Sequence, residues 1–491
     1  MSKPLCIYCP AEAKAGMLAL VMLVALIPCA AAFAQQAPDV AAAERSEPVA
    51  GDTPATIRLH DKVGAPPWLL LSGSQRTRYE GLRNQFRPLL AKHDQALALR
   101  TLFTLGLNLG PVSIVGELQD SRAYLTDADS GVSTIVINAL EPLQAYVNLQ
   151  LENTFTTGDV FKLRGGLQTM DLGSRRLVAR NRFRNTIQNY AGLTADWQAA
   201  SGMRLFTFAV LPVRVEPSNL ERADLLDNRI LLDRAGFDLT FWGAFINRPL
   251  PLDWQLETYF FGLNENDSGK TVSRNRQLFT PGLRVFRAAR PGHWDADIEG
   301  VLQFGSRRPV LNPNAGDADV RAHFFHAAVG YTFASRWSPR VSAELDYASG
   351  DDPATPGRYE RFDTLFGPRR TDFGPTDIYG PLGRENIISA GVRAGLRPGP
   401  RVDGYLSWRA NWLANTGDFF ARTGLRDPNS QSGQFAGHQV ELRSRLWLVP
   451  DSLRWELGSA VFLQGAFMRN APNATGNGNP VFFYTGLELF F

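Results

Sequence analysis

The chain has 491 residues, of which 44% are hydrophobic, and a formal net charge of +3 at pH 7. Its three cysteines, Cys6, Cys9 and Cys29, all precede residue 35. If residues 1–34 are removed, the remaining chain has no thiol, which excludes disulfide scaffolds, thiolate metal sites and cysteine nucleophiles. Because the net charge is close to zero, attraction of a charged partner would have to come from local clusters of charge.

Residues 1–34 have the features of a Sec-type secretory signal peptide. Lys3 and Lys14 precede the apolar run 17–27, and Ala32-Phe33-Ala34 is a small-x-small cleavage pattern. Residues 35–67 are rich in Ala, Pro, Glu and Asp with little periodicity, which predicts a flexible periplasmic leader. No later stretch has the roughly 20 apolar residues that a spanning helix needs. If the protein enters a membrane, it does so as strands.

From residue 68 the sequence alternates between apolar and polar side chains in segment after segment. In 97–109, Leu99, Phe103 and Leu105 share one face, while Arg100 and Thr104 share the other. We predict 18 strands, at 69–80, 97–109, 111–121, 143–152, 160–169, 188–199, 203–212, 230–243, 252–263, 278–288, 292–304, 323–334, 339–347, 385–396, 401–412, 437–448, 452–464 and 480–491. An even number suits a barrel with both ends on one side.

The connections between these strands alternate in length. Short ones include Gly110, residues 200–202, Asn247-Arg248-Pro249 and Pro450-Asp451, and long ones, such as 170–187 and 348–384, lie between them. Short periplasmic turns and long extracellular loops are typical of outer-membrane barrels.

The last predicted strand ends on the aromatic residue Phe491, which resembles the signal that the outer-membrane barrel assembly machinery reads. The predicted fold is therefore all-β: a transmembrane antiparallel β-barrel over residues 68–491, in the outer membrane of a Gram-negative bacterium.

The basic side chains of the predicted lumen are almost all guanidinium groups, since the chain has 45 arginines and six lysines. Arg binds carboxylates in bidentate fashion, so a ladder of arginines could draw a polyanion inward. The lumen-facing candidates are Arg76, Arg78, Arg100, Arg164, Arg393, Arg409, Arg443 and Arg445. The alternative is that they pair with lumen carboxylates, namely Glu80, Glu117, Glu344, Asp346, Asp403 and Glu441, and fill a wide barrel.

The third long loop contains five arginines in ten residues: Arg175, Arg176, Arg180, Arg182 and Arg184. If the loop folds inward, these residues form a constriction. If it stays outside, they contact the anionic head groups of lipopolysaccharide.

No catalytic constellation, metal site or cofactor motif is predicted. The six histidines are scattered, and His323 and His326 would lie on opposite faces of one strand. Asp351-Asp352 could bind calcium or form an exposed acidic turn. The arginines are spread over strands without a stacking motif, so nucleic-acid binding is not predicted either.

Several segments, in order along residues 69–491, resemble the alginate export family. They are SGSQRTRYEGLRNQFR (72–87), GELQDSRAY (116–124), RGGLQTMDLGSRRLVARNRFRN (164–185), ELDYASGDD (344–352), FDTLFG (362–367) and RDPNSQSGQFAGHQVELR (426–443). The resemblance implies an 18-stranded barrel through which a polyuronate leaves the periplasm. It assigns pore chemistry to the matched positions Arg76, Arg78, Arg100, Asp120, Arg122 and Arg443.

The chain departs from the family in two respects. The family commonly has Gly-Arg-Gln and Phe-Asp-Gly where this chain has Gly166-Leu167-Gln168 and Tyr190-Ala191-Gly192. The alginate exporter also carries a long periplasmic plug where this chain has only residues 449–452. Either another element, such as loop 122–142, gates the channel, or the solute differs.

The sequence thus predicts a non-enzymatic channel for an anionic polysaccharide, with outer-membrane lipid around it and a periplasmic polysaccharide-synthesis complex as a further partner. The alternatives are a general or small-anion porin, and a barrel whose loops carry enzymatic or adhesive activity.

Overall fold

The computed structural model describes residues 56–269, 271–476 and 478–491. The predicted signal peptide and residues 35–55 of the predicted leader lie outside the described residues. All described residues belong to one compact unit.

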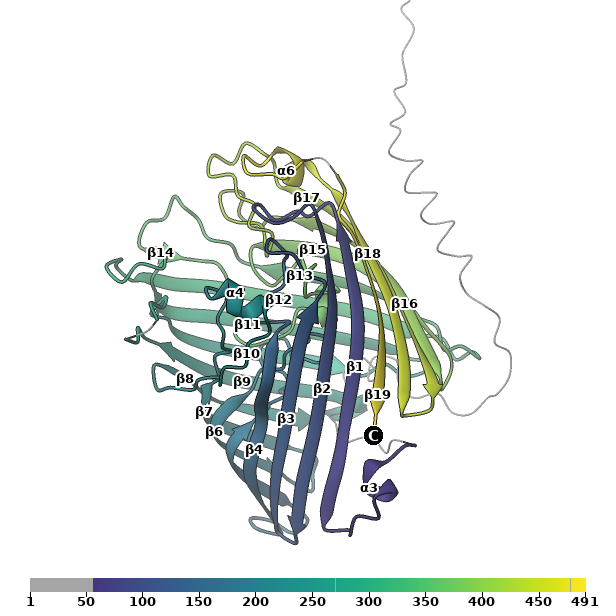
Figure 1. Cartoon of the computed structure of the whole chain (residues 1–491). Coiled ribbons are helices and arrows are strands. Elements are labelled where there is room, and N and C mark those ends of the chain that lie inside the picture. Colours follow the sequence, from purple (N-terminus) through teal and green to yellow (C-terminus); the bar gives the residue numbers. More distant parts are fainter. Residues whose placement is uncertain (1–55, 270, 477) are drawn as a thin grey trace, which may run out of the picture. The chain divides into compact units, whose positions relative to one another are not determined.

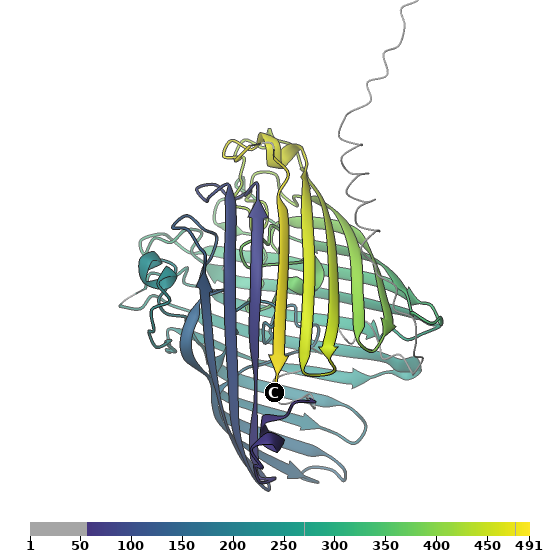
Figure 2. The ribbon, with the colours of Figure 1, turned by 45° about the vertical axis from the view of Figure 1, so that its right-hand side comes forward.

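Eighteen long strands form one antiparallel sheet that closes on itself, and β1 pairs with both β2 and β19. The first and last strands lie side by side in Figures 1 and 2. The strands are β1 (Leu69–Arg83), β2 (His93–Leu109), β3 (Val112–Tyr124), β4 (Asn138–Glu152), β5 (Val160–Gln168), β6 (Tyr190–Gln198), β7 (Arg204–Pro212), β8 (Leu239–Pro249), β9 (Trp254–Glu265), β10 (Gln277–Arg287), β11 (Trp294–Arg307), β12 (Ala318–Thr332), β13 (Arg340–Ala348), β15 (Ile387–Gly399), β16 (Val402–Trp412), β17 (Phe435–Val449), β18 (Leu453–Gln464) and β19 (Val481–Phe490).

The remaining elements are short and lie in connections. They are α3 (Leu59–Lys62), α4 (Arg222–Leu226), α5 (Arg370–Phe373), α6 (Ala466–Asn470), the 3-10 turn η1 (Pro251–Asp253) and the two-residue strand β14 (Arg358–Tyr359), which pairs with β12 in parallel. Among the described residues, no helix has the length and apolarity needed to cross a membrane. The predicted fold class, a closed antiparallel barrel of 18 strands, is confirmed.

The connections alternate as predicted, with tight turns at one end and longer loops at the other. We number the loops used below as L1 (84–92), L3 (169–189), L4 (213–238), L7 (349–386) and L8 (413–434). The loop end is extracellular by the rule that holds for such barrels.

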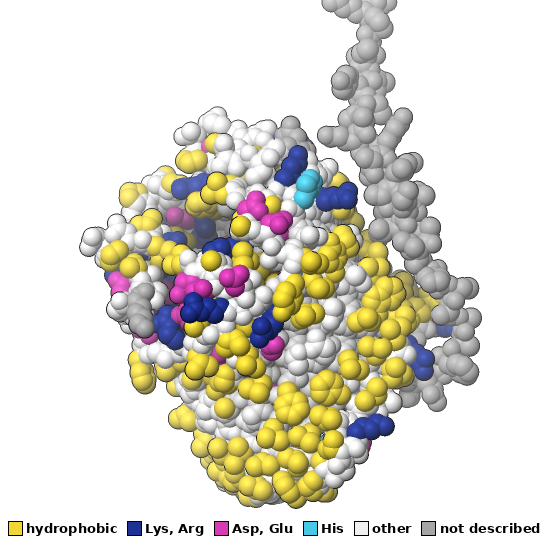
Figure 3. Space-filling view, viewed as in Figure 1, with side chains coloured by type: hydrophobic (Ala, Val, Ile, Leu, Met, Phe, Trp, Pro, Cys, Tyr) yellow, Lys and Arg dark blue, Asp and Glu magenta, His cyan; other side chains and the backbone are white. Residues whose placement is uncertain are grey.

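Side chains alternate between the outer wall and the lumen. On β2, Phe103 and Leu105 are exposed, whereas Arg100, Leu102 and Thr104 are buried. Hydrophobic side chains cover much of the wall in Figure 3, and most of the charged side chains in view lie toward the loop end. The backbone groups of strands in hydrocarbon can all be satisfied only within such a closed sheet.

The predicted strand 230–243 is wrong in its first half. β8 begins at Leu239, and the residues before it belong to L4, where Arg214 and Arg234 form an isolated antiparallel bridge. The apolar side chains of Ile230 and Leu232 mimic a strand in the sequence but are exposed on the loop. The predicted turn 247–249 is consequently the end of β8, and the true turn is at η1.

The described part of the predicted leader contacts the turn end of the barrel. The Thr56 hydroxyl donates to the Pro450 carbonyl at 2.7 Å, and the Ile57 amide donates to the Ser452 hydroxyl at 2.7 Å. The backbone of Phe491 exchanges two hydrogen bonds with Gly73, which completes the closure between β19 and β1.

L3 and L7 fold into the barrel and supply much of its interior. Val178 of L3 and Phe366 of L7 form a parallel bridge, and Phe366 packs against the rings of Tyr190 and Phe241 on the wall. Side chains on both loops, including Val178 and Phe373, are buried. The lumen is therefore a packed interior crossed by two loops.

Asp233 makes the docking of L4 sensitive to pH. Burial raises the pKa of its carboxyl to about 7, and the nearby Glu141 carboxylate acts in the same direction. The usual value for Asp is about 3.9. Because the folded state holds this proton more tightly, the contribution of Asp233 to stability is fully present below about pH 4 and is lost as the pH rises to about 7, by at most about 1.4 kcal/mol per pH unit.

The substitution Asp233→Asn is expected to slow hydrogen exchange in L4, and by more at pH 8 than at pH 5, because the amide never ionises. Comparison of variant and wild type at each pH by mass spectrometry measures this difference. Equal effects at both pH values would contradict the assignment.

Candidate functional site

The backbone of L3 is held against the wall by arginines of β1 and β2. Arg76 donates to the carbonyls of residues 182 and 184 at 2.9 Å each, and Arg100 donates to the same two carbonyls at 3.0 and 3.1 Å. Arg78 donates to the carbonyl between them, that of Phe183, at 2.6 Å. Three guanidinium groups thus bind three successive carbonyls. Hydrogen bonds from charged donors are the stronger kind.

Two further contacts fix the same segment of L3. The Asn185 amide donates to the carbonyls of Leu99 and Val136 at 2.9 Å each. Arg180 forms a bidentate pair with Glu117 of β3, at 2.9 and 2.7 Å. The side chains of Arg180 and Glu117 are only 3% and 1% exposed, so this ion pair is fully withdrawn from water.

L3 and L7 are joined by a buried network of charges. Arg176 of L3 pairs with Asp372 of L7 at 3.1 Å and with Glu299 of β11 at 2.6 Å. Arg384 of L7 also pairs with Asp372 and donates to the Arg176 carbonyl at 3.1 Å. Burial alone would raise the pKa of Asp372, but Arg176 and Arg384 hold it well below its usual range. Asp372 therefore carries its negative charge at any physiological pH.

L7 is in turn bound to the part of the wall formed by β15, β16 and β17. Arg370 pairs with Glu441 of β17 and donates to the Tyr405 hydroxyl at 2.9 Å, and this hydroxyl donates to Glu441 at 2.8 Å. Arg393 of β15 donates to the Thr371 carbonyl at 3.0 Å. Arginines and carboxylates therefore hold both loops within the barrel.

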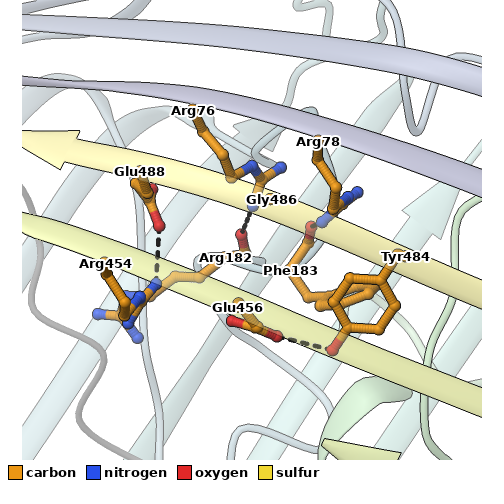
Figure 4. Close-up of a pocket in the computed structure, with 9 residues that line it drawn as sticks. All are labelled: Arg76, Arg78, Arg182, Phe183, Arg454, Glu456, Tyr484, Gly486 and Glu488. Atoms are coloured by element: carbon orange, nitrogen blue, oxygen red, sulfur yellow. Dashed lines mark hydrogen bonds and ion pairs between the residues drawn. The ribbon is translucent and has the colours of Figure 1, made fainter. Parts of the chain in front are cut away.

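Two cavities lie on the two sides of Phe183. One is lined by residues of L3, β1, β18 and β19: Arg76, Arg78, Arg182, Phe183, Arg454, Glu456, Tyr484, Gly486 and Glu488 (Figure 4). The other is lined by residues of L3, L7, β16 and β17: Arg175, Asn181, Arg182, Phe183, Pro368, Arg370, Thr371, Tyr405 and Arg443. Arg182 and Phe183 belong to both, so the tip of L3 separates the two spaces.

Phe183 is held between two cations. The guanidinium carbons of Arg78 and Arg370 lie 4.4 and 4.7 Å from its ring centroid, and the Tyr484 ring meets it edge-on at 5.3 Å. Glu488 and Arg454, both buried, form a 2.7 Å ion pair in the first cavity, and Glu456 accepts the Tyr484 hydroxyl at 2.7 Å. Positive and negative groups alternate along this wall.

The structure places ten of the twelve predicted pore-lining residues on the lumen face. They are Arg76, Arg78, Arg100, Glu117, Arg164, Arg393, Arg409, Glu441, Arg443 and Arg445. Arg409 pairs with Asp346 at 2.8 Å and with Glu344, Arg445 pairs with Asp403 at 2.9 Å, and Arg164 lies over the Tyr146 ring. Pairing with the lumen carboxylates, the alternative use of these arginines, is thus observed for several of them.

Asp120 and Arg122 do not line the lumen, and their prediction is wrong. They have the opposite parity from the buried residues Glu117, Gln119 and Ser121, and they share the outer face with exposed Leu118. There they pair with each other at 2.9 Å. The resemblance to the family motifs had assigned both residues to the pore. In a strand, however, side chains two and four residues after Leu118 lie on the same face as Leu118.

The five arginines of the third loop lie within the barrel, as the inward alternative predicted. Arg176 and Arg180 are buried in ion pairs, while Arg175 and Arg182 both pair with Asp171, at 3.1 and 3.0 Å. Arg175 and Arg182 line the cavities described above, and the Arg184 side chain is half-buried. The structure adds Arg370, Asp372, Arg384 and Arg454 to the site. The first three come from an aperiodic loop, where no sequence pattern indicates the direction of a side chain.

The histidine pair lies as the strand period predicts. His326 is buried against Asp346 at 2.7 Å, and His323 is on the other face, stacked on Tyr347. Across residues 56–491, the two undescribed positions apart, no group of three or more His, Cys, Asp or Glu side chains is arranged to hold a metal ion.

Comparison with known proteins identifies the barrel more closely. The family model described as alginate export matches residues 68–482, and no curated protein matches. Three solved structures from Pseudomonas aeruginosa each cover 86% of this chain, which covers 98% of theirs. OpdL has a TM-score of 0.53 at 9% identity, OccK8 (OprE) 0.52 at 11%, and OpdK with vanillate 0.51 at 12%. At these identities the likeness concerns the fold alone.

The substitution Glu117→Gln is expected to release L3, because it leaves the buried Arg180 without its counter-charge at a cost of about 3–5 kcal/mol. We expect a lower midpoint of thermal unfolding in detergent and a higher single-channel conductance in a planar bilayer. The control is Glu360→Gln, whose ion pair with Arg358 is exposed and is worth at most about 1 kcal/mol. Unchanged conductance and stability in Glu117→Gln would refute this role.

Proposed function

The chain belongs to the alginate export family, and from that premise we propose that this outer-membrane channel conducts an anionic polysaccharide of the polyuronate class. The polymer passes the tip of L3, between the wall of β1, β18 and β19 on one side and L7 with β16 and β17 on the other. Its carboxylates meet the guanidinium groups that line the two cavities beside Phe183, and no covalent chemistry is needed.

The observation that supports this proposal best is the composition of the two cavities. Between them they are lined by Arg76, Arg78, Arg175, Arg182, Arg370, Arg443 and Arg454, and by only two carboxylates, Glu456 and Glu488. A guanidinium group presents two parallel donors that match a carboxylate. A narrow space with an excess of them attracts sugar acids over neutral sugars, since confinement strengthens the field of clustered charge.

The acidic residues beside these arginines are equally useful for transport. An arginine that already donates to a carboxylate or a carbonyl offers an incoming polymer only part of its hydrogen-bonding capacity. Conduction requires sites that bind strongly enough to admit the solute and weakly enough to release it. The pairs of Arg454 with Glu488 and of Arg370 with Glu441 meet this requirement.

The proposal is tested by block of the single-channel current in a planar bilayer. A short polymannuronate is expected to interrupt the current at concentrations at which a neutral glucan of the same length has no effect. Block by neither polymer, together with a small-ion current unaffected by sugar acids, would contradict the proposal and leave a general porin.

Arg182→Gln is expected to weaken block by the uronate about tenfold, because a charge-assisted hydrogen bond is worth roughly 1.5–3 kcal/mol. The matched control is Arg290→Gln, which removes an arginine exposed at a turn, where it pairs with Asp253. If the uronate blocks the Arg182→Gln and Arg290→Gln channels equally, the tip of L3 does not contact the polymer.

A further inference from the structure

Four arginines from four different loops converge toward the extracellular end of the lumen. They are Arg87 of L1, Arg184 of L3, Arg369 of L7 and Arg422 of L8. Arg87 and Arg369 donate to the same carbonyl, that of Gly380, at 3.2 and 3.0 Å. Arg87 also donates through its Nε to the backbone carbonyl of Arg422 at 3.2 Å.

Gly383 shows how close two of these side chains are. A Cβ atom placed on Gly383 would lie 3.1 Å from Cδ of Arg369 and 3.2 Å from Cγ of Arg422. Arg184 completes the group: burial, followed by repulsion from Arg422, lowers the pKa of its guanidinium to about 10. Burial also lowers the pKa of Arg369 well below its usual value, and repulsion from Arg422, Arg184 and Arg87 acts in the same direction.

Their charge is not balanced as it is deeper in the barrel. Within the described part of the chain, Arg422 alone of the four has a carboxylate within ion-pair distance, Glu385 at 3.1 Å. The Nε atoms of Arg184 and Arg369 are buried without a hydrogen-bond partner among the described residues. Arg176 and Arg180, by contrast, each pair with carboxylates. Asp94 and Asp377 act on Arg87 and Arg184 from beyond ion-pair distance. Four neighbouring cations with a single carboxylate within ion-pair distance favour the binding of an anion.

We propose that Arg87, Arg184, Arg369 and Arg422 form an oxyanion-binding site at the outer exit, which takes carboxylate groups of the solute after it has passed L3. The identity of this ligand rests on the proposed function. The Arg422 side chain is 46% exposed, whereas Arg369 is buried, so the site is open from the outside and leads inward to Arg184, two residues from Arg182.

The test compares block by a mannuronate trisaccharide added from the loop side and from the turn side of an oriented channel. Arg422→Gln is expected to weaken loop-side block about tenfold and to leave turn-side block unchanged. The fold is preserved in this variant, because Arg87 binds the backbone carbonyl of residue 422. The control is Arg358→Gln, which has a similar exposure, 41%, and also pairs with a glutamate.

Binding of the same trisaccharide, with maltotriose as the neutral control, is measured independently by calorimetry on the protein in detergent. If Arg422→Gln and Arg358→Gln bind the trisaccharide equally and are blocked by it equally, the exit site is overturned. The proposed function still stands in that case if Arg182→Gln weakens block from both sides. If the current is blocked from neither side, the proposed function fails, and calorimetry alone decides the exit site. Weaker binding in Arg422→Gln then supports it, and unchanged binding refutes it.

Discussion

The hydrogen bonds from Arg76, Arg78 and Arg100 to the carbonyls of residues 182–184 are the interaction on which the interior depends. A loop inside a barrel has backbone groups that neither the sheet nor bulk water satisfies, and a buried carbonyl without a donor is costly. Guanidinium groups solve this problem because one side chain offers five donors in a fixed plane. Arginine in the wall is therefore first a structural requirement for L3.

The same arrangement determines the electrostatics of the conduction path. Two kinds of contact are present. The first is donation to carbonyls, which neutralises no charge, and Arg76 has no ion pair besides it within the described part of the chain. The second is the buried ion pair: Arg78 pairs with Glu80 and Asp377, Arg100 with Glu488, Arg176 with Glu299 and Arg180 with Glu117. Buried ion pairs of the second kind contribute little net stability, but they fix the position of the loop. Where the loop tip meets the wall, positive charge is therefore least balanced at Arg76.

The sequence predicted the barrel well because a strand that separates lipid from a polar lumen must alternate with period two. Seventeen of the 18 strands fall close to the predicted ranges, and the error at 230–243 arose where exposed loop residues imitate a strand. The same period correctly predicted that the side chains of Arg100 and Arg443 lie on the lumen face. It could not show that L7 supplies Arg370, Asp372 and Arg384, because these contacts depend on the path of an aperiodic loop. The prediction that Asp120 and Arg122 line the pore is wrong because it followed the motif resemblance, whereas the strand period places both side chains on the outer face.

Whether the tip of L3 occupies the conduction path can be tested directly, because residues 35–491 contain no cysteine. Phe183→Cys introduces a single thiol at the tip, and Leu89→Cys introduces one on L1, where the side chain is 97% exposed. A bulky, negatively charged thiol reagent is then applied during single-channel recording. If the tip of L3 lies in the path, the current is lost lastingly for Phe183→Cys and is unchanged for Leu89→Cys. Full labelling of Phe183→Cys by mass spectrometry with an unchanged current would contradict it.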